Sequence, residues 1–455
     1  MRFWLLALLP LVLAFQVWAL AARDDFPTPD KDPFYKPPKG WESKPLGTIL
    51  RSRKIEPKGL FDLKVKEAWQ ILYRTSYVTE DQPTTTVTTV LVPFNAADDK
   101  LLTFGYFEDA NGPQCAPSNG FRNGISDDAA SLANLALLLP YLQAGYIVTV
   151  PDKEGDIGAF GSGRVEGQQT LDGIRATLKF DKLGLSKNTK VAAWGYSGGA
   201  IQIGWAASLK PVYAPELPMV GWYYGGTPAS IRSLVSKLNE SLFSGFLISG
   251  VTGIMDTYPE LKKYIKEKST QEALDAFDFA RSHCSSDVNL RYMFQNFNSD
   301  KYSKVGGQYL KAPVVEKIMD ELEMGSRSEE TPTEPVMMSH GKSDEIAPFK
   351  SAYQAYENWC SNGANIHFTK YTNLLAAHLV TAITDITSSF SFIKDRLDGK
   401  PAQSYCSVTE RDDIILDTDA LGQEFKHVLE IIAGVLSDKV GPGDKILQDH
   451  LKNGN

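Results

Sequence analysis

Short apolar and β-branched runs alternate with longer helical stretches along most of this chain. The clearest strand pattern is the β-branched run 84–92, which ends at Pro93. Residues 131–143 and 167–183 have helical character. Strands that alternate with helices predict βαβ units and a central, mostly parallel sheet. The further runs with strand character are 101–107, 144–150, 190–194, 335–341 and 366–371.

The pattern changes between residues 226 and 323, which are mostly helical in character. Such a stretch is either a plain helical subdomain packed on the sheet or a cap over an active site. We favour a cap, because lids that exclude water typically lie on insertions of this kind. The expected core is then 23–225 with 324–406, followed by a C-terminal extension, 407–455. The apolar residues that mark the insertion are Leu242, Phe243, Phe246, Leu247, Ile248, Val251 and Ile254.

The first residues have the pattern of a secretory signal peptide. Arg2 precedes an apolar run, 3–13, and a group of small residues follows. This pattern predicts a signal peptide over residues 1–22, cleaved after Ala21 or Ala22, and therefore a secreted protein. Because the stretch is just long enough to cross a bilayer, a signal anchor is the alternative.

Two further features agree with export. An even number of cysteines in an exported protein suggests two disulfides, and spacing alone leaves all three pairings open. No two cysteines form a CxxC motif, so a zinc or redox site is disfavoured. Asn239-Glu240-Ser241 is a glycosylation acceptor, a motif that also occurs by chance. The four cysteines are Cys115, Cys284, Cys360 and Cys406.

Composition and net charge bear on the kind of partner and say little about the reaction. The chain has 455 residues, of which 43% are hydrophobic and 22% are charged, as in ordinary globular proteins. The length suits one large domain with an insertion. The formal net charge is −8. Because no basic surplus is available to neutralise phosphates, we expect no nucleic-acid partner. The C-terminal extension contains one amphipathic helical pattern, Ala420 to Leu436.

The segment Gly195-Tyr196-Ser197-Gly198-Gly199 fits the motif G-x-S-x-G. A nucleophilic serine needs a tight strand-to-helix turn that exposes its Oγ, and the crowded backbone there demands glycine on both sides. An apolar strand pattern precedes the segment and helical residues 200–207 follow it. We therefore predict an α/β-hydrolase with Ser197 as its nucleophile and the N–H of Gly198 as one oxyanion donor. An idle serine in a glycine-rich turn is the alternative.

The serine needs a histidine base, and the chain has six histidines. In this fold the triad follows the chain order serine, acid, histidine. His378 follows the strand pattern 366–371 and opens a helix, which is where the histidine loop belongs. The other histidines lie in the presumed cap, in strand patterns or in the tail: His283, His340, His367, His427 and His450.

The acid is expected on the loop after the strand pattern 335–340. Asp344 and Glu345 both lie on that loop, and Pro348 follows them. We favour Asp344, because the shorter side chain is more readily fixed at a strand end. Glu345 remains the alternative.

Several motifs together make the chain resemble the fungal secretory lipases of the lipase A type from yeasts, over about residues 54–406. One departure is Lys153, where the family pattern has an aromatic residue. The tail beyond Cys406 is another, because it does not align with the family. Besides the segments around Ser197 and His378, the motifs are Phe107-Glu108-Asp109, Cys115-Ala116-Pro117-Ser118, Val150-Pro151-Asp152-Lys153-Glu154-Gly155 and His340-Gly341-Lys342-Ser343-Asp344-Glu345-Ile346-Ala347-Pro348.

The resemblance implies an α/β-hydrolase fold with an inserted helical cap and triacylglycerols as substrates. It also implies roles for individual residues, and it agrees with the triad predicted above. In this family Asp109 would supply the oxyanion N–H that complements Gly198. The implied residues are Ser197, Asp344 and His378 for the triad, Gly198 and Asp109 for the oxyanion hole, and Cys115 with Cys284 and Cys360 with Cys406 for the disulfides.

The predicted function is a secreted serine carboxylic ester hydrolase, and within that class a triacylglycerol lipase. It would act through an acyl-enzyme on a lipid or small ester, with transient contact with a lipid interface and with no metal or cofactor. One alternative is an esterase that deacetylates small secondary metabolites. Two more distant alternatives are a peptidase on the same fold and a secreted binding protein without activity. The complete order of serine, acid and histidine argues against the last of these.

Overall fold

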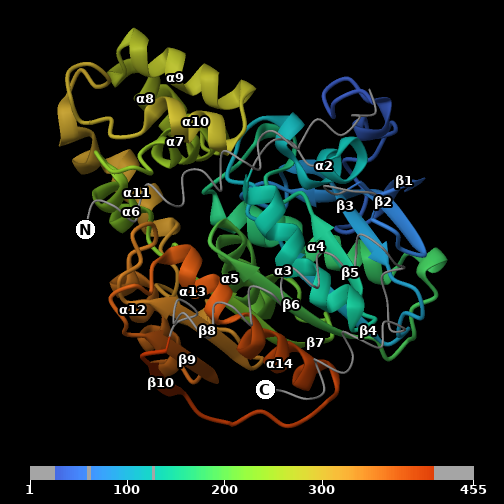
Figure 1. Cartoon of the computed structure of the whole chain (residues 1–455). Coiled ribbons are helices and arrows are strands. Elements are labelled where there is room, and N and C mark those ends of the chain that lie inside the picture. The colour runs from blue at the N-terminus through green and yellow to red at the C-terminus, as the bar shows by residue number, and fades with distance from the viewer. Residues whose placement is uncertain (1–25, 59–62, 125–128, 414–455) are drawn as a thin grey trace.

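The computed structural model describes residues 26–58, 63–124 and 129–413 (Figure 1). These residues form a ten-stranded sheet in the order β1-β2-β3-β5-β4-β6-β7-β8-β9-β10. The pairs β1/β2, β2/β3 and β3/β5 are antiparallel, and all the other neighbours are parallel. The predicted mostly parallel sheet is confirmed. Its strands are β1 (Ile49–Ile55), β2 (Glu67–Ser76), β3 (Pro83–Val92), β4 (Lys100–Gly105), β5 (Ile147–Pro151), β6 (Lys190–Tyr196), β7 (Met219–Gly225), β8 (Val336–Gly341), β9 (Ile366–Tyr371) and β10 (Ser407–Arg411).

Helices cover both faces of this sheet and enclose two hydrophobic clusters. One cluster joins the sheet to α4, α5 and α12, and it includes the fully buried Trp222 and Ile203. The other joins the opposite face to α3 and α14, and it includes Leu138 and Ile393. The fold is therefore a three-layer α/β arrangement. The helices of these layers are α2 (Pro117–Asn123), α3 (Ala129–Gln143), α4 (Gly163–Leu178), α5 (Gly198–Tyr213), α12 (Phe349–Ser361), α13 (His378–Thr384) and α14 (Ile386–Leu397).

The inserted helices form a separate body beside the sheet, coloured yellow-green to yellow in Figure 1. They have a hydrophobic core of their own, with Met255 and Ala276 completely buried. This arrangement confirms a helical insertion within the predicted stretch 226–323. Its helices are α6 (Ile231–Leu238), α7 (Gly245–Thr257), α8 (Pro259–Lys268), α9 (Gln271–Ser282), α10 (Ser285–Tyr292) and α11 (Pro313–Glu321).

Two disulfides join segments that are distant in sequence. Cys115, in the turn after β4, is bonded to Cys284 in the helical insertion. Cys360, at the end of α12, is bonded to Cys406, which immediately precedes β10. The pairing is the one that the family resemblance implies. The first disulfide ties the insertion to the core, and the second holds the chain beside the last strand of the sheet.

The sequence pattern leaves four strands unpredicted, namely β1, β2, β7 and β10. The predicted helix 167–183 is also different in the structure, because α4 ends at Leu178 and a 3₁₀ turn, Asp181–Leu183, follows it. The predicted signal peptide, 1–22, and the predicted tail helix, Ala420 to Leu436, lie outside the described residues.

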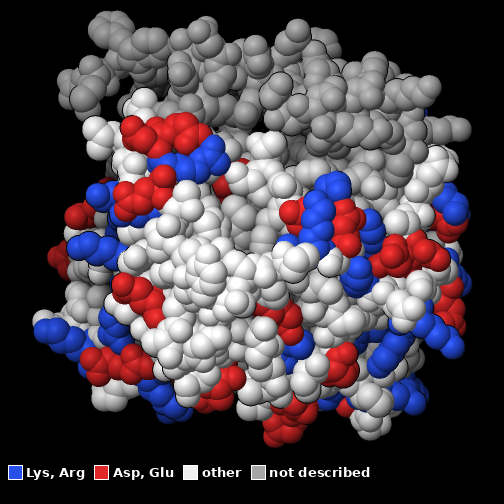
Figure 2. All heavy atoms as spheres, turned by 90° about the horizontal axis from the view of Figure 1, so that it is seen from below, with Lys and Arg blue, Asp and Glu red and all other residues white. Residues whose placement is uncertain are grey.

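Charged side chains of both signs share the face shown in Figure 2, where basic and acidic side chains are mixed in small groups around uncharged areas. Within residues 26–413, apart from the two undescribed gaps, no helix has the length and apolar character needed to cross a bilayer.

Candidate active site

Ser197 lies in a sharp turn between β6 and α5. Its backbone has φ of +55° and ψ of −122°, a conformation that L-residues rarely adopt. The side chain does not cap the helix that follows, so the hydroxyl remains available for another partner. A strained serine at a strand-to-helix turn is the geometry that the G-x-S-x-G motif predicts.

The glycines on either side of Ser197 are required by close packing. A Cβ atom on Gly199 would lie 2.1 Å from the carbonyl oxygen of Gly105, at the end of the neighbouring strand β4. A Cβ atom on Gly195 would lie 2.3 Å from the carbonyl oxygen of Gly199. Side chains at these positions would therefore push α5 away from the sheet and open the turn.

Asp109 lies against the same turn from the loop that follows β4. Because β4 and β6 are parallel neighbours, their carboxyl ends bring this loop beside Ser197. A Cβ atom on Gly198 would lie 1.7 Å from Oδ1 of Asp109, so the two residues are in direct contact. Asp109 itself has a positive φ of +53°. The structure thus places the two predicted oxyanion residues together beside the serine.

His378 begins α13 and contacts Asp344, which follows β8. The distance between His378 Nδ1 and Asp344 Oδ2 is 2.6 Å, and both side chains are buried. The other carboxylate oxygen of Asp344, Oδ1, accepts hydrogen bonds from the N–H groups of Ile346 at 2.9 Å and Ala347 at 2.7 Å. The carboxylate is therefore fixed on one side by the backbone and faces the imidazole with the other.

The imidazole of His378 lies beside the serine turn. Its ring is 5.2 Å from the ring of Tyr196, the residue before Ser197. Its Cε1 atom would lie 2.8 Å from a Cβ atom on Gly226, and the N–H of Ser197 donates to the adjacent carbonyl of Gly225. Nε2 of His378 is buried and has no hydrogen-bond partner within the part of the chain that the structure describes.

Electrostatics favour an ionic Asp344 and a basic His378. Burial alone would raise the pKa of Asp344, but the charge of His378 and its hydrogen bond hold that pKa below the ordinary value. Burial alone would lower the pKa of His378, but the charge of Asp344 and its hydrogen bond raise that pKa. The pair therefore stabilises a proton on His378, which a general base must accept during catalysis.

Three contacts around the histidine were not predictable from the sequence pattern. Glu345, the alternative acid, accepts the backbone N–H of His378 at 2.8 Å and not its ring. The Tyr196 hydroxyl donates to the His378 carbonyl at 2.7 Å. His340 is buried, with Nε2 3.4 Å from Oδ2 of Asp344, and burial is the main cause that lowers its pKa. These contacts hold both ends of the Asp344–His378 pair.

The remaining histidine candidates and the glycosylation acceptor lie elsewhere. His283 stacks on Phe279 within the helical insertion. His367 lies on β9, and its Nδ1 is 2.8 Å from Oγ of Ser407. The side-chain amide of Asn239 is partly buried and is bonded to Asn296 and to the N–H of Phe297. His427 and His450 lie outside the described residues.

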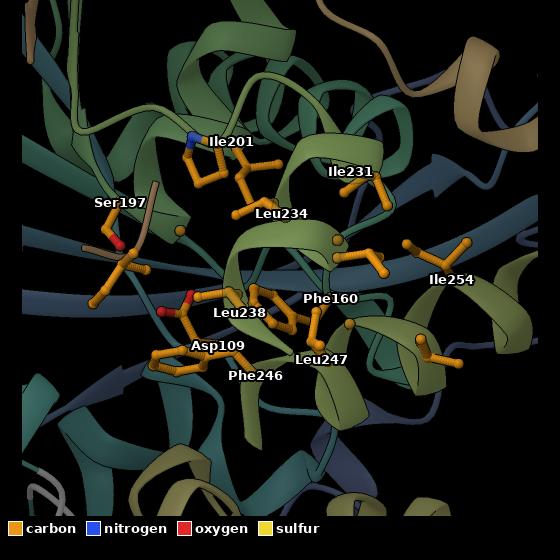
Figure 3. Close-up of a pocket in the computed structure, with 17 residues that line it drawn as sticks. Asp109, Phe160, Ser197, Ile201, Ile231, Leu234, Leu238, Phe246, Leu247 and Ile254 are labelled. Carbon is orange, nitrogen blue, oxygen red and sulfur yellow. The ribbon is translucent and has the colours of Figure 1, made fainter. Parts of the chain in front are cut away.

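An apolar pocket begins at the serine and extends under the helical insertion. Ser197, Gly198 and Asp109 line one part of it. Residues of α5, α6 and α7 line most of the rest, together with four loop residues, Phe160, Gly161, Pro228 and Ile346. Figure 3 shows Ser197 and Asp109 toward one side and Ile231 and Ile254 toward the other. The apolar lining consists of Phe160, Ile201, Pro228, Ile231, Leu234, Val235, Leu238, Phe246, Leu247, Val251, Ile254 and Ile346.

A second apolar pocket continues this one into the insertion. The two pockets share Val235, Leu247 and Val251 as lining residues, and the second is also lined by Phe277 and Phe297. In the first pocket, the polar side chains are those of Ser197 and Asp109, which lie at the serine end. Among the described residues, no three His, Cys, Asp or Glu side chains are arranged to hold a metal ion.

Comparisons with known proteins point to one family. The sequence model of the secretory lipase family matches residues 127–405. A protein of Malassezia globosa named secreted triacylglycerol lipase LIP2 is 50% identical over 451 residues, which cover 99% of this chain and 100% of that protein. A secreted triacylglycerol lipase of Malassezia furfur, LIP1, is 42% identical over 92% of this chain and 86% of its own length.

A solved structure supports the same relationship. The X-ray structure of Candida antarctica lipase A superposes on this chain with a TM-score of 0.79 at 30% sequence identity. The superposition covers 92% of this chain and 99% of the lipase. The similarity therefore extends over both the sheet and the helical insertion.

Proposed function

Because the chain belongs to the secretory lipase family, we propose that it is a secreted triacylglycerol lipase that cleaves esters through Ser197, Asp344 and His378. The observation that carries this proposal is the fixed Asp344–His378 pair beside the strained Ser197 turn, at the end of an apolar pocket. Relatives named as secreted lipases, together with the predicted signal peptide, support secretion.

Catalysis follows from these positions as acyl transfer in two steps. Nε2 of His378 takes the Ser197 proton while Oγ attacks the ester carbonyl. The oxyanion accepts hydrogen bonds from the N–H groups of Gly198 and Asp109, and losing one such donor typically costs about 10²–10³ in rate. His378 then protonates the leaving alcohol, and water repeats the sequence on the acyl-enzyme to release the fatty acid.

The direction of the first helix turn supports the oxyanion role. In the first turn of α5, the N–H groups of Ala200 and Ile201 donate to the Ser197 carbonyl, and the N–H of Gly198, the first helical residue, has no acceptor within the helix. This N–H is therefore available to the oxyanion, and the positive end of the helix dipole favours negative charge there. The charge of His378 during the reaction is balanced by Asp344, so the buried site never holds an isolated cation.

The apolar pocket is the proposed site for the acyl chain. Its lining carries almost no polar groups away from Ser197 and Asp109, which suits a hydrocarbon and not a short polar acyl group. Its continuation into the helical insertion provides room for several methylene groups, each worth about 0.8 kcal/mol when buried. Long-chain esters should therefore be hydrolysed faster than acetates.

Chain-length profiling tests this function directly. The purified protein is expected to hydrolyse p-nitrophenyl decanoate with a higher kcat/KM than p-nitrophenyl acetate, and to release fatty acid from emulsified triacylglycerol. A fluorophosphonate probe is expected to label Ser197 and to stop both reactions. A strong preference for acetate, without activity on the emulsion, would contradict the lipase assignment in favour of a deacetylase.

Gly250, on α7, offers a way to test the position of the acyl chain. It lines the pocket, and a Cβ atom there would have no neighbour within 4 Å. Gly250→Phe is expected to lower kcat/KM for decanoate by about tenfold, the scale on which a pocket discriminates by a few methylenes, and to change acetate hydrolysis little. The matched control is Gly307→Phe, because Gly307 belongs to the insertion but does not line the pocket. An equal loss for both esters would contradict this placement.

A further inference from the structure

A group of ionisable side chains is buried at and beside the loop between β4 and Pro113, which carries Asp109 and is called the oxyanion loop below. Lys153 and Glu154 follow β5, Glu108 and Asp109 follow β4, and Glu166 lies in the first turn of α4. All five are buried, and Lys153 and Glu166 are completely inaccessible to solvent. The proposed mechanism uses only the backbone of Asp109, so the charges of this group have no role assigned above.

Lys153 is the centre of the group. Its Nζ is 2.8 Å from Oε1 of Glu154 and 2.9 Å from Oε2 of Glu166. The second oxygen of Glu166 accepts the backbone N–H of Gly161 at 2.9 Å. The Lys153 ammonium also lies 5.2 Å from the ring centroid of Phe160, within the range of a cation–π contact. One buried cation thus holds both ends of the loop 152–162.

The loop 152–162 contacts two parts of the active site, the oxyanion loop and the helical insertion. On one side, Asn111 of the oxyanion loop donates through Nδ2 to the Gly158 carbonyl at 2.8 Å. On the other side, the Ser162 hydroxyl lies 2.8 Å from the hydroxyl of Thr257, on helix α7 of the insertion. The loop therefore connects the oxyanion hole to the cap.

The same loop supplies a wall of the acyl pocket. Phe160 and Gly161 line the pocket, and Figure 3 shows Phe160 between Asp109 and Ile254. Helix α7 packs closely against it, because a Cβ atom on Gly253 would lie 2.3 Å from the Phe160 carbonyl oxygen. A shift of the loop would consequently move the pocket wall and the oxyanion loop together.

The charges of the group do not balance when every member is ionised. One lysine faces Glu108, Glu154, Glu166 and Asp109, and Asp152 lies next to it, bonded to Ser118. Uncompensated buried charge is strongly unfavourable, so the group must retain protons near neutral pH. Burial is the largest cause that raises the pKa of Glu108, Glu154 and Glu166. Raising the pH therefore adds negative charge beside Asp109, where the oxyanion forms.

We propose that Lys153, Glu154 and Glu166 are positioning residues that fix the oxyanion loop and the pocket wall at Phe160 relative to each other. Ionisation within their cluster then limits ester hydrolysis at alkaline pH. The inference rests on the proposed function, because it assigns these residues to the same site. The Ser197, Asp344 and His378 triad predicts a fall in kcat/KM only at acid pH (the acid limb), since His378 must be neutral to act as a base. A second fall in kcat/KM at alkaline pH (the alkaline limb) would come from the cluster.

The pH profile of Glu154→Gln tests the charge. The glutamine oxygen can still accept from Lys153, but the side chain no longer ionises. We expect kcat/KM of the parent enzyme for p-nitrophenyl decanoate to fall on the alkaline side, and this fall to move up by at least about one pH unit in Glu154→Gln. The matched control is Asp172→Asn, because Asp172 is a buried carboxyl on α4, the helix that carries Glu166, and bonds Thr75, Tyr213 and Arg175. This variant should leave the alkaline fall in kcat/KM unchanged.

The ester selectivity of Lys153→Met tests the positioning. Methionine has a similar length but no charge, so the loop loses the ion pairs of Lys153 with Glu154 and Glu166. The ratio of decanoate to acetate kcat/KM is expected to fall at least about fivefold, because the Phe160 wall moves while an acetyl group does not reach it. If Lys153→Met does not fold, the pH profile of Glu154→Gln decides alone.

Two results would overturn the inference. One is an alkaline limb that is absent from the folded parent or unchanged in Glu154→Gln. The other is an ester ratio in folded Lys153→Met within twofold of the parent. Both are distinct from failure of the proposed function, which would appear as a parent protein without hydrolysis that depends on Ser197.

Discussion

Replacing Ser197 by alanine is expected to lower kcat for p-nitrophenyl decanoate by about 10⁶-fold, the scale reached when a serine nucleophile is removed. The loss follows because no other hydroxyl occupies the turn between β6 and α5 from which the acyl-enzyme would form. Alanine keeps a Cβ atom at a position with φ of +55°, so the backbone strain is the same as in the parent. The effect should therefore appear in turnover and not in stability.

Steady-state kinetics with a thermal melt of the same sample would check this prediction. The matched control is Ser208→Ala, since Ser208 is a buried serine on the same helix, α5, and is not part of the pocket lining. It should keep the activity of the parent. Activity of Ser197→Ala within tenfold of the parent would show that another residue carries the reaction, and the proposed mechanism would then be wrong.

The nucleophile could be predicted from sequence because its geometry is local. Gly195 and Gly199 lie within four residues of each other, and the crowding that requires glycine arises where α5 meets β4 and β6. His378 and Asp344 could be predicted because the order of the strands fixes which loops reach the serine. The contacts that refine the site could not, because Tyr196 and His378 are 182 positions apart and nothing in a tyrosine within G-x-S-x-G indicates its partner.

The strands that the sequence pattern does not reveal have a similar explanation. Strand β10 has mostly exposed side chains, so no alternation of apolar and polar residues marks it. Its position follows from pairing with β9 and from the adjacent disulfide at Cys406. Strand β1 pairs with β2 at the opposite edge and is only partly buried. Edge strands such as these are defined by tertiary contacts more than by local pattern.

The buried position of Lys153 could not be predicted from the sequence. The family resemblance leads us to expect an aromatic residue at this position, and a lysine alone predicts a solvated side chain. Only the structure shows that it is completely buried and that Glu154 and Glu166 surround it. The carboxylates come from different elements, so their convergence depends on the packing of α4 against the end of β5.

Replacing Asp344 by asparagine is expected to lower kcat by about 10⁴-fold, as in other triads whose acid loses its charge. The reason lies in two backbone donors. Oδ1 of Asp344 accepts the N–H groups of Ile346 and Ala347, so an asparagine must place its oxygen there and turn its NH₂ group toward His378. Nδ1 of His378 then has to accept a hydrogen bond, which leaves the proton on Nε2, the atom that should receive it from Ser197.

The pH dependence of this variant gives a second readout. Because the charge of Asp344 raises the pKa of His378, its removal lowers that pKa, and the acid limb of kcat/KM should move to lower pH. Glu345→Gln is the matched comparison, since Glu345 accepts only the backbone N–H of His378 and a glutamine oxygen can do the same. Its activity should fall by less than about tenfold. A larger loss in Glu345→Gln than in Asp344→Asn would reverse the assignment of the acid, because the residue that orients the imidazole must be the one whose charge the reaction needs.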